Sequence, residues 1–163
     1  MALLTTAGTV ATPPGTQGSR MTRTFVAPSV ASSVDFCFQF VSNDSGGFRD
    51  FFLADLLTTA GTFTLATADN ATGSPATAGL PAISANVTLT PAVAPRFLSG
   101  VTMLGGGLFG ISSSWMTNRV CSSFALPASV LGTEVTLRFT VSDVGDTGVD
   151  SGVVIDNVRV RLQ

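Results

Sequence analysis

The residues of this chain best suited to chemistry are four acids near its end. They lie in the stretch DVGDTGVDSGVVIDNVRV, and they are Asp143, Asp146, Asp150 and Asp156. If Val153 to Leu162 is a strand, its side chains alternate between two faces, and Asp156 lies on the same face as Val154 and Val158. An ionised carboxylate in an apolar row is costly unless a partner meets it. We therefore expect Asp156 to contact a cation, an arginine or a group of backbone N–H donors.

Further oxygen-bearing side chains follow the Phe-rich stretch DFCFQFVSN, and the two groups together suit a calcium ion. Calcium takes about six to eight oxygen ligands, and two separate segments can supply them. The expected ligands are Asn43, Asp44, Asp50, Asp146, Asp150 and Asp156. The spacing differs from that of an EF-hand loop, so the fold must assemble the site. The same acids also suit turns, with Asp156 bonded to backbone N–H groups or to Arg49, and both interpretations stay open.

The chain has few side chains that could act as a catalytic acid, base or nucleophile. The chain has no histidine and no tyrosine, and Glu134 is its single glutamate. Two carboxylates can flank a glycosidic bond, but general acid–base chemistry otherwise lacks its usual residues. The chain has eight arginines, no lysine and a net charge of −2, which is not the basic footprint of a nucleic-acid binder. We expect neither an enzyme nor a nucleic-acid partner.

Cys37 and Cys121 are the two cysteines of the chain. Cys37 alternates with Phe36 and Phe38, and Cys121 alternates with Val120, so both are expected on outward strand faces. A disulfide between them requires the two strands to be neighbours, with Cα atoms within about 7 Å. We predict this bond, and two buried thiols are the alternative.

Trp115 is the single tryptophan, in the stretch SSSWMTN. A buried core position is one interpretation, because indole rings are mostly buried. Exposed beside the glycine-rich stretch at 103–110, the ring would instead be a platform on which a sugar stacks.

Alternation of apolar and polar residues predicts the elements that position these groups. In SVDFCFQFV the apolar side chains fall on one face, and TEVTLRFTVSD repeats the pattern, which indicates two facing sheets. A hairpin is expected through Ala60-Gly61. The predicted strands are residues 2–6, 21–26, 34–41, 51–57, 62–67, 87–90, 120–126, 134–141 and 152–162. The fold class is all-β, a two-sheet antiparallel sandwich (jelly roll) of about eight to ten strands with little helix.

The length of 163 residues fits one domain, 1–163, with a long variable excursion around 68–115. Charged residues make up 11% of the chain and hydrophobic residues 45%, yet no apolar run reaches the roughly 18 residues of a membrane span. The first residues lack a basic region and an apolar core, so we expect no signal peptide there. A surface covered by Thr, Ser, Ala and Gly suits a secreted or cell-surface protein.

Three stretches carry a resemblance to a known family. MALLTT, FQFVSND…FRDFFLADL and VTLRFTVSDVGDTGVDSGVVIDNVRV resemble the secreted bacterial β-sandwich modules called choice-of-anchor domains, over most of the chain except about 69–114. The family pattern reads Ser-Asn-Glu-Phe where this chain has Ser42-Asn43-Asp44-Ser45. The final Ile-Asp-Asn-Val is similar to the last strand of jelly-roll carbohydrate-binding modules that contain structural calcium.

Composition and resemblance together predict a non-catalytic extracellular structural module. We expect it to be calcium-stabilised and to build a surface appendage, filament or matrix by assembling with copies of itself or with other surface components. The alternative is a carbohydrate-binding module that recognises glycans through loops at one end of the sandwich, with Trp115 as the platform.

Overall fold

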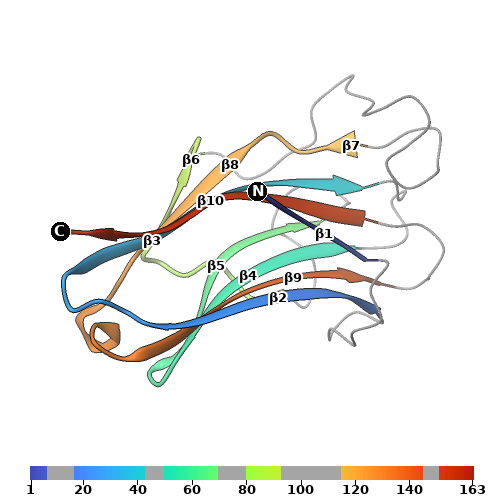
Figure 1. Ribbon diagram of the computed structural model, residues 1–163. Helices are drawn as coiled ribbons and strands as arrows, with labels where there is room; N and C mark the ends of the chain where they lie inside the picture. The colour runs from blue at the N-terminus through green and yellow to red at the C-terminus, as the bar shows by residue number, and fades with distance from the viewer. Residues whose placement is uncertain (7–16, 43–49, 70–79, 93–114, 145–150) are drawn as a thin grey trace.

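Two antiparallel sheets pack face to face in the computed structural model, which describes residues 1–6, 17–42, 50–69, 80–92, 115–144 and 151–163 (Figure 1). The strands are β1 (Ala2–Thr5), β2 (Gln17–Val26), β3 (Ala31–Ser42), β4 (Phe51–Thr58), β5 (Gly61–Asp69), β6 (Val87–Thr90), β7 (Trp115–Met116), β8 (Val120–Ala125), β9 (Glu134–Asp143) and β10 (Ser151–Leu162). One short 3-10 helix, η1 (Ala128–Val130), precedes β9. Within the described ranges, no helix is long and apolar enough to cross a membrane.

The strand order is that of a jelly roll. Sheet A runs β1-β10-β3-β8-β6, with β7 also paired to β3, and sheet B runs β2-β9-β4-β5. Early strands pair with late ones, β1 with β10, β2 with β9 and β3 with β8, and β4 and β5 close the series as a hairpin. A long antiparallel ribbon is therefore rolled around one core. The predicted all-β sandwich is confirmed.

Phenylalanines from both sheets fill the core. Phe36 and Phe38 of β3 are each 1% exposed, because the alternation of β3 turns them inward. The ring of Phe36 meets Phe139 of β9 edge-on at a centroid distance of 5.0 Å, and that of Phe38 meets Phe52 of β4 at 4.9 Å. Burying an aromatic side chain of this size contributes about 1.5–3 kcal/mol. These contacts join the two sheets across the core, together with buried aliphatic side chains.

All nine predicted strands are present, and the structure adds one. The additional strand is β7, whose two residues are too few to show any alternation. The predicted hairpin joins β4 to β5, with Thr58 opposite Gly61. Gly61 has a φ of 132°, a conformation that side chains disfavour and glycine adopts readily.

A bulge in β10 overturns one prediction. Asn157 and Val158 together lie opposite Phe36, so the alternation shifts by one residue there. Asn157 has a φ of 54°, in the left-handed region that asparagine tolerates better than most residues. Ile155 faces the core before the bulge, and Val158 lines the inner side after it. The prediction that Asp156 shares an apolar row with Val158 is wrong, because Asp156 lies on the outer face.

Several strand ends meet at one end of the sandwich. Ser42 pairs with Ser151 in sheet A, and Phe51 lies between Asp69 and Ser142 in sheet B. We call this the Asp50 end, after the residue that precedes β4. The remaining described turns, including the β4–β5 hairpin, lie toward the opposite end (Figure 1).

Candidate functional site

Buried acids gather at the Asp50 end. Asp50 and Asp143 are 0% exposed, and Asp69 is 1% exposed. The Asp50 Oδ1 atom accepts a hydrogen bond from the backbone N–H of Val144 at 3.1 Å. Asp50 and Val144 therefore lie next to each other. Each adjoins one of the two segments that carry the expected calcium ligands.

Most of the expected calcium ligands lie outside the described residues: Asn43, Asp44, Asp146 and Asp150. Within the described part of the chain, no three acids are close enough together to hold a metal ion. The structure places Asp50, which directly follows segment 43–49, beside Val144, which directly precedes segment 145–150.

Asp156 stands apart from these acids. Its side chain is 45% exposed, with Oδ2 at 3.7 Å from Arg119 Nη2 and Oδ1 at 3.9 Å from the Met1 amino group. A strand rises about 3.3 Å per residue, so Asp156 is about 16 Å along β10 from Ser151. The charge partner of Asp156 is an arginine, as one of the sequence interpretations proposes. It is Arg119, whereas Arg49 lies outside the described residues.

Trp115 begins β7, and its backbone pairs with Ser42 at the Asp50 end. Its side chain is outside what the structure describes, so neither the core position nor the sugar platform is decided.

A disulfide joins Cys37 to Cys121 across β3 and β8. The two residues are direct cross-strand partners, and their Cα atoms are 3.9 Å apart. The bond closes a sequence separation of 84 residues. Both side chains are on the outer face of sheet A, as their alternation predicts.

Beside the disulfide, Asp35 is the centre of a polar network. Its Oδ1 atom accepts hydrogen bonds from Ser33 Oγ and Ser123 Oγ, each at 2.8 Å. Its Oδ2 atom accepts from Arg159 Nε at 3.3 Å and from Arg161 Nε. Burial alone would raise the pKa of Asp35, but these hydrogen bonds outweigh it and the pKa is lowered.

The network forms one wall of a surface basin of about 280 Å³ on the outer face of sheet A. Arg119, Arg159 and Arg161 line the basin, and each side chain is about half exposed. A second acid, Asp55 of β4, lies on the outer face of sheet B and pairs with Arg138 Nη2 at 2.7 Å. Burial raises the pKa of Asp55 despite that pair. Both acids are held by arginine in arrangements typical of structural ion pairs.

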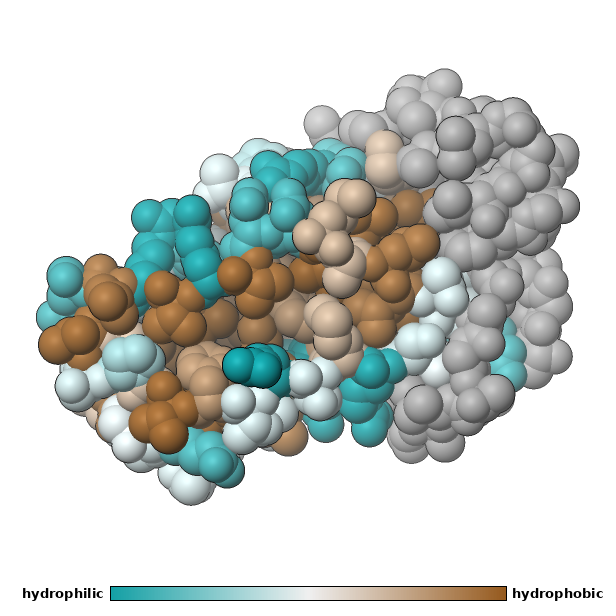
Figure 2. All heavy atoms as spheres, in the orientation of Figure 1, coloured by the Kyte–Doolittle hydropathy of each residue, from teal (hydrophilic) through white to brown (hydrophobic). Residues whose placement is uncertain are grey.

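Apolar side chains are exposed along one side of the sandwich. Among the described residues, the large hydrophobic side chains that are exposed are Met1, Leu3, Val26, Val30, Val158 and Leu162. Met1 directly precedes β1, and the others belong to β1, β10, the end of β2 or the β2–β3 connection. Figure 2 shows the resulting apolar band across this face. Within it lies a groove of about 450 Å³ between β2 and the second half of β10.

Sequence reasoning missed the Asp35 network and the groove. Asp35, Arg159 and Arg161 carry the charges of an ion-pair network, but the bulge at Asn157 decides on which face of β10 the two arginines lie. The groove lies between β2 and β10, and no local pattern reports that these two strands face each other.

Comparison with protein-family models, with curated proteins and with solved structures gave no match to this chain.

Proposed function

We propose that this chain is a non-catalytic structural module of an extracellular assembly, a building block of a surface appendage, filament or matrix. The observation that carries the proposal is the apolar band on β1, β10 and β2. Contiguous exposed apolar surface on a soluble domain marks an interaction site, because water leaves it when a partner covers it. The partners proposed are copies of this chain or other surface components.

The disulfide supports the extracellular location. Disulfides persist in oxidising compartments and are rare in the cytosol, where thiols are kept reduced. The bond between Cys37 and Cys121 joins two central strands of sheet A, so it ties the middle of the sheet rather than a loose end. The covalent bond keeps β3 and β8 joined even when hydrogen bonds between them break locally.

Calcium is proposed at the Asp50 end, with Asn43, Asp44, Asp50, Asp146 and Asp150 as its ligands. The short distance between Asp50 and the Val144 backbone supports convergence of the two acid-bearing segments on one site. Carboxylate and amide oxygens are the ligands that calcium prefers. Bound there, the ion would neutralise acids that otherwise repel one another. Asp156 is not part of this proposal, because its outer-face position separates it from Asp50.

Light scattering after size-exclusion chromatography tests the assembly proposal, over a range of protein concentrations and followed by electron microscopy. We expect the mass to rise with concentration and ordered oligomers or fibres to appear. Leu3→Ser, which removes an apolar side chain that is 52% exposed, should shift the mass toward the monomer. A monodisperse monomer at every concentration would count against assembly through this band.

Glycan binding is the second candidate, and the position of β7 favours it. Trp115 is at the Asp50 end, next to Ser42, where strands of both sheets end. Loops clustered at one end of a sandwich are common binding surfaces. A glycan array with the protein and its Trp115→Ala variant tests this candidate. Binding that the substitution abolishes would support it, and an array without hits would remove it.

A further inference from the structure

The basin on the outer face of sheet A is built mainly on four neighbouring strands, β10, β3, β8 and β6. Cys37, Cys121 and Thr90 lie side by side across three of them. Apart from the disulfide and Phe36, every residue that lines the basin is polar. Small-molecule sites commonly measure about 300–1,000 Å³, so a polar basin of about 280 Å³ fits a small hydrophilic ligand.

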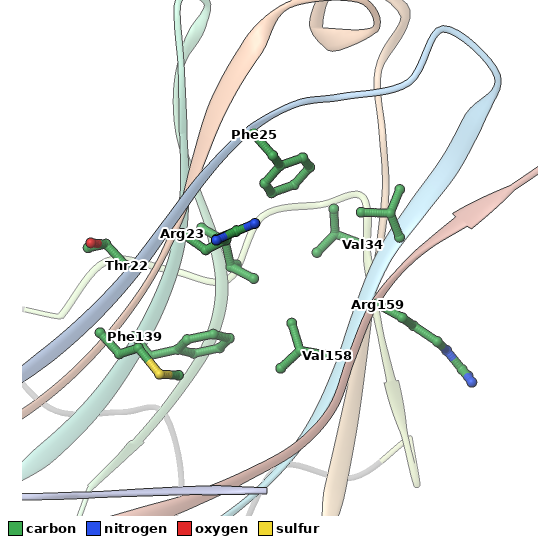
Figure 3. A pocket seen from close by; sticks show the side chains of 10 residues that line it. Thr22, Arg23, Phe25, Val34, Phe139, Val158 and Arg159 are labelled. Atoms are coloured by element: carbon green, nitrogen blue, oxygen red, sulfur yellow. The ribbon is translucent and has the colours of Figure 1, made fainter.

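Three arginines border the basin from two sides. Arg159 and Arg161 come from β10, and Arg119 directly precedes β8, with β3 between them. Figure 3 shows that Arg159 points away from the apolar groove, whereas Val158 points into it. The three half-exposed guanidinium groups therefore concentrate positive charge on the outer face of sheet A.

Asp35 uses only part of the hydrogen-bonding capacity of Arg159 and Arg161. Both arginines donate to the same atom, Asp35 Oδ2, and both do so through Nε. Arg138, by contrast, donates to Asp55 through Nε and Nη2 together. Among the described residues, no group accepts a hydrogen bond from the Nη atoms of Arg159 or Arg161. A guanidinium group has four N–H donors on its two Nη atoms, so both arginines can bind a second acceptor while they hold Asp35.

Positive charge exceeds negative charge around the basin. Asp35 supplies one negative charge against the two arginines that contact it. Arg119 lies beside Asp156, but 3.7 Å separates Nη2 from Oδ2, which is longer than a charge-assisted hydrogen bond of about 2.7–2.9 Å. One positive charge is therefore left over among these five side chains, although the whole chain has a net charge of −2. A single anionic group would balance it.

We propose that the basin binds a carboxylate group on a small hydroxylated ligand, which is the chemistry of a sugar acid. The planar guanidinium fork binds a carboxylate through two parallel N–H donors, and Arg119 is the arginine least engaged by an acid of its own. Thr90 and Asn157, which also line the basin, bring a hydroxyl and an amide that can bond to sugar hydroxyls. The inference goes beyond the proposed function and depends neither on assembly nor on Trp115.

The test titrates galacturonate into the full chain at low ionic strength and follows the heat of binding by calorimetry. We expect saturable binding of one molecule per chain. The methyl ester of galacturonate keeps the hydroxyls and loses the charge, while acetate keeps the charge and lacks the hydroxyls. Each should bind at least about tenfold more weakly than galacturonate. The galacturonate trimer distinguishes the source of the group, because a site for a polysaccharide binds the trimer more tightly than the monomer.

Four protein variants locate the site, and circular dichroism checks that each one folds. Arg119→Gln should weaken galacturonate binding at least about tenfold, whereas Arg20→Gln, which removes an exposed arginine outside the basin lining, should change it by less than about twofold. Asp156→Asn should strengthen binding up to about fivefold, because Asp156 no longer competes for Arg119. Thr90→Val keeps the shape of the side chain and removes its hydroxyl, so it should weaken galacturonate binding and leave acetate binding unchanged.

Three results would overturn the inference. If galacturonate and its trimer both fail to bind, the basin is not a site for sugar acids. If acetate binds as tightly as galacturonate, the arginines attract an adventitious ion only. If Trp115→Ala abolishes galacturonate binding and Arg119→Gln leaves it unchanged, the ligand lies at the Asp50 end. None of these results bears on assembly through the apolar band, which light scattering tests separately.

Discussion

Replacing Asp35 by asparagine tests whether its network stabilises the sandwich. The carboxylate is 8% exposed and accepts four hydrogen bonds, two from serines and two from arginines. The amide keeps the shape but places an NH2 donor where Oδ1 or Oδ2 accepts hydrogen bonds. Buried bonds to a charged group contribute about 1.5–3 kcal/mol each, while the half-exposed arginines add about 0.2–1 kcal/mol each. Because the amide oxygen still accepts some of these bonds, we expect a net loss of about 2–3 kcal/mol at neutral pH.

The pH dependence of that loss identifies its cause. The pKa of Asp35 is lowered below the ordinary value of 3.8, so the folded state binds its proton less tightly than the unfolded state does. Its contribution is fully present above the unfolded pKa and is lost as the pH falls through the lowered folded pKa. Asparagine has no such titration. The difference between wild type and Asp35→Asn should therefore shrink on acidification below about pH 4.

Urea denaturation at neutral and acidic pH measures both quantities. Asp156→Asn is the matched control, because Asp156 is on the same outer face but is 45% exposed, with charge partners at 3.7 and 3.9 Å. It should cost less than about 1 kcal/mol. If Asp35→Asn is as stable as wild type at neutral pH, or if its deficit does not change with pH, the network does not act through the ionised carboxylate.

Three further predictions concern the disulfide, calcium and the bulge. Replacing Cys37 and Cys121 by serine should lower the free energy of unfolding by up to about 4.5 kcal/mol, since the bond closes a long loop, and native protein should show no alkylatable thiol by intact mass. Calcium at a hundredfold above its dissociation constant should add about 2.7 kcal/mol, so a chelator should lower the melting temperature, and Asp150→Asn should blunt this effect while Asp156→Asn leaves it intact. Identical melting in calcium and in chelator would end the calcium proposal. Asn157→Val should cost about 1–3 kcal/mol in urea denaturation, because a β-branched residue is strained at a φ of 54°, and an unchanged midpoint would show that the bulge relaxes.

Much of the fold could be predicted because alternation is a local property. In β3 and β9 the inward row was readable from the order of the residues, and the core contacts of Phe36 with Phe139 follow from two such rows facing each other. The outward faces of Cys37 and Cys121 were readable in the same way. Their bond was a conditional prediction, because only the pairing of β3 with β8 brings the two residues opposite each other.

The candidate sites were harder to predict because they depend on register. One extra residue at Asn157 turns Val158 to the inner side while Asp156 stays on the outer face, and the alternation of the sequence does not show it. Arg161 reaches Asp35 from a position 126 residues later in the chain, through the pairing of β10 with β3. The sequence around Asp35 therefore does not indicate Arg161 as its partner, and the sequence around Arg161 does not indicate Asp35.

By itself the sequence determined the period-two pattern, and with it the strands, their buried faces and the all-β class, because side chains alternate along any extended chain. The tertiary structure decided which strands are neighbours, which strands line the groove and which arginine meets which acid. These choices depend on long-range pairing, in which the free energy of the whole core selects one register among several that local alternation permits equally.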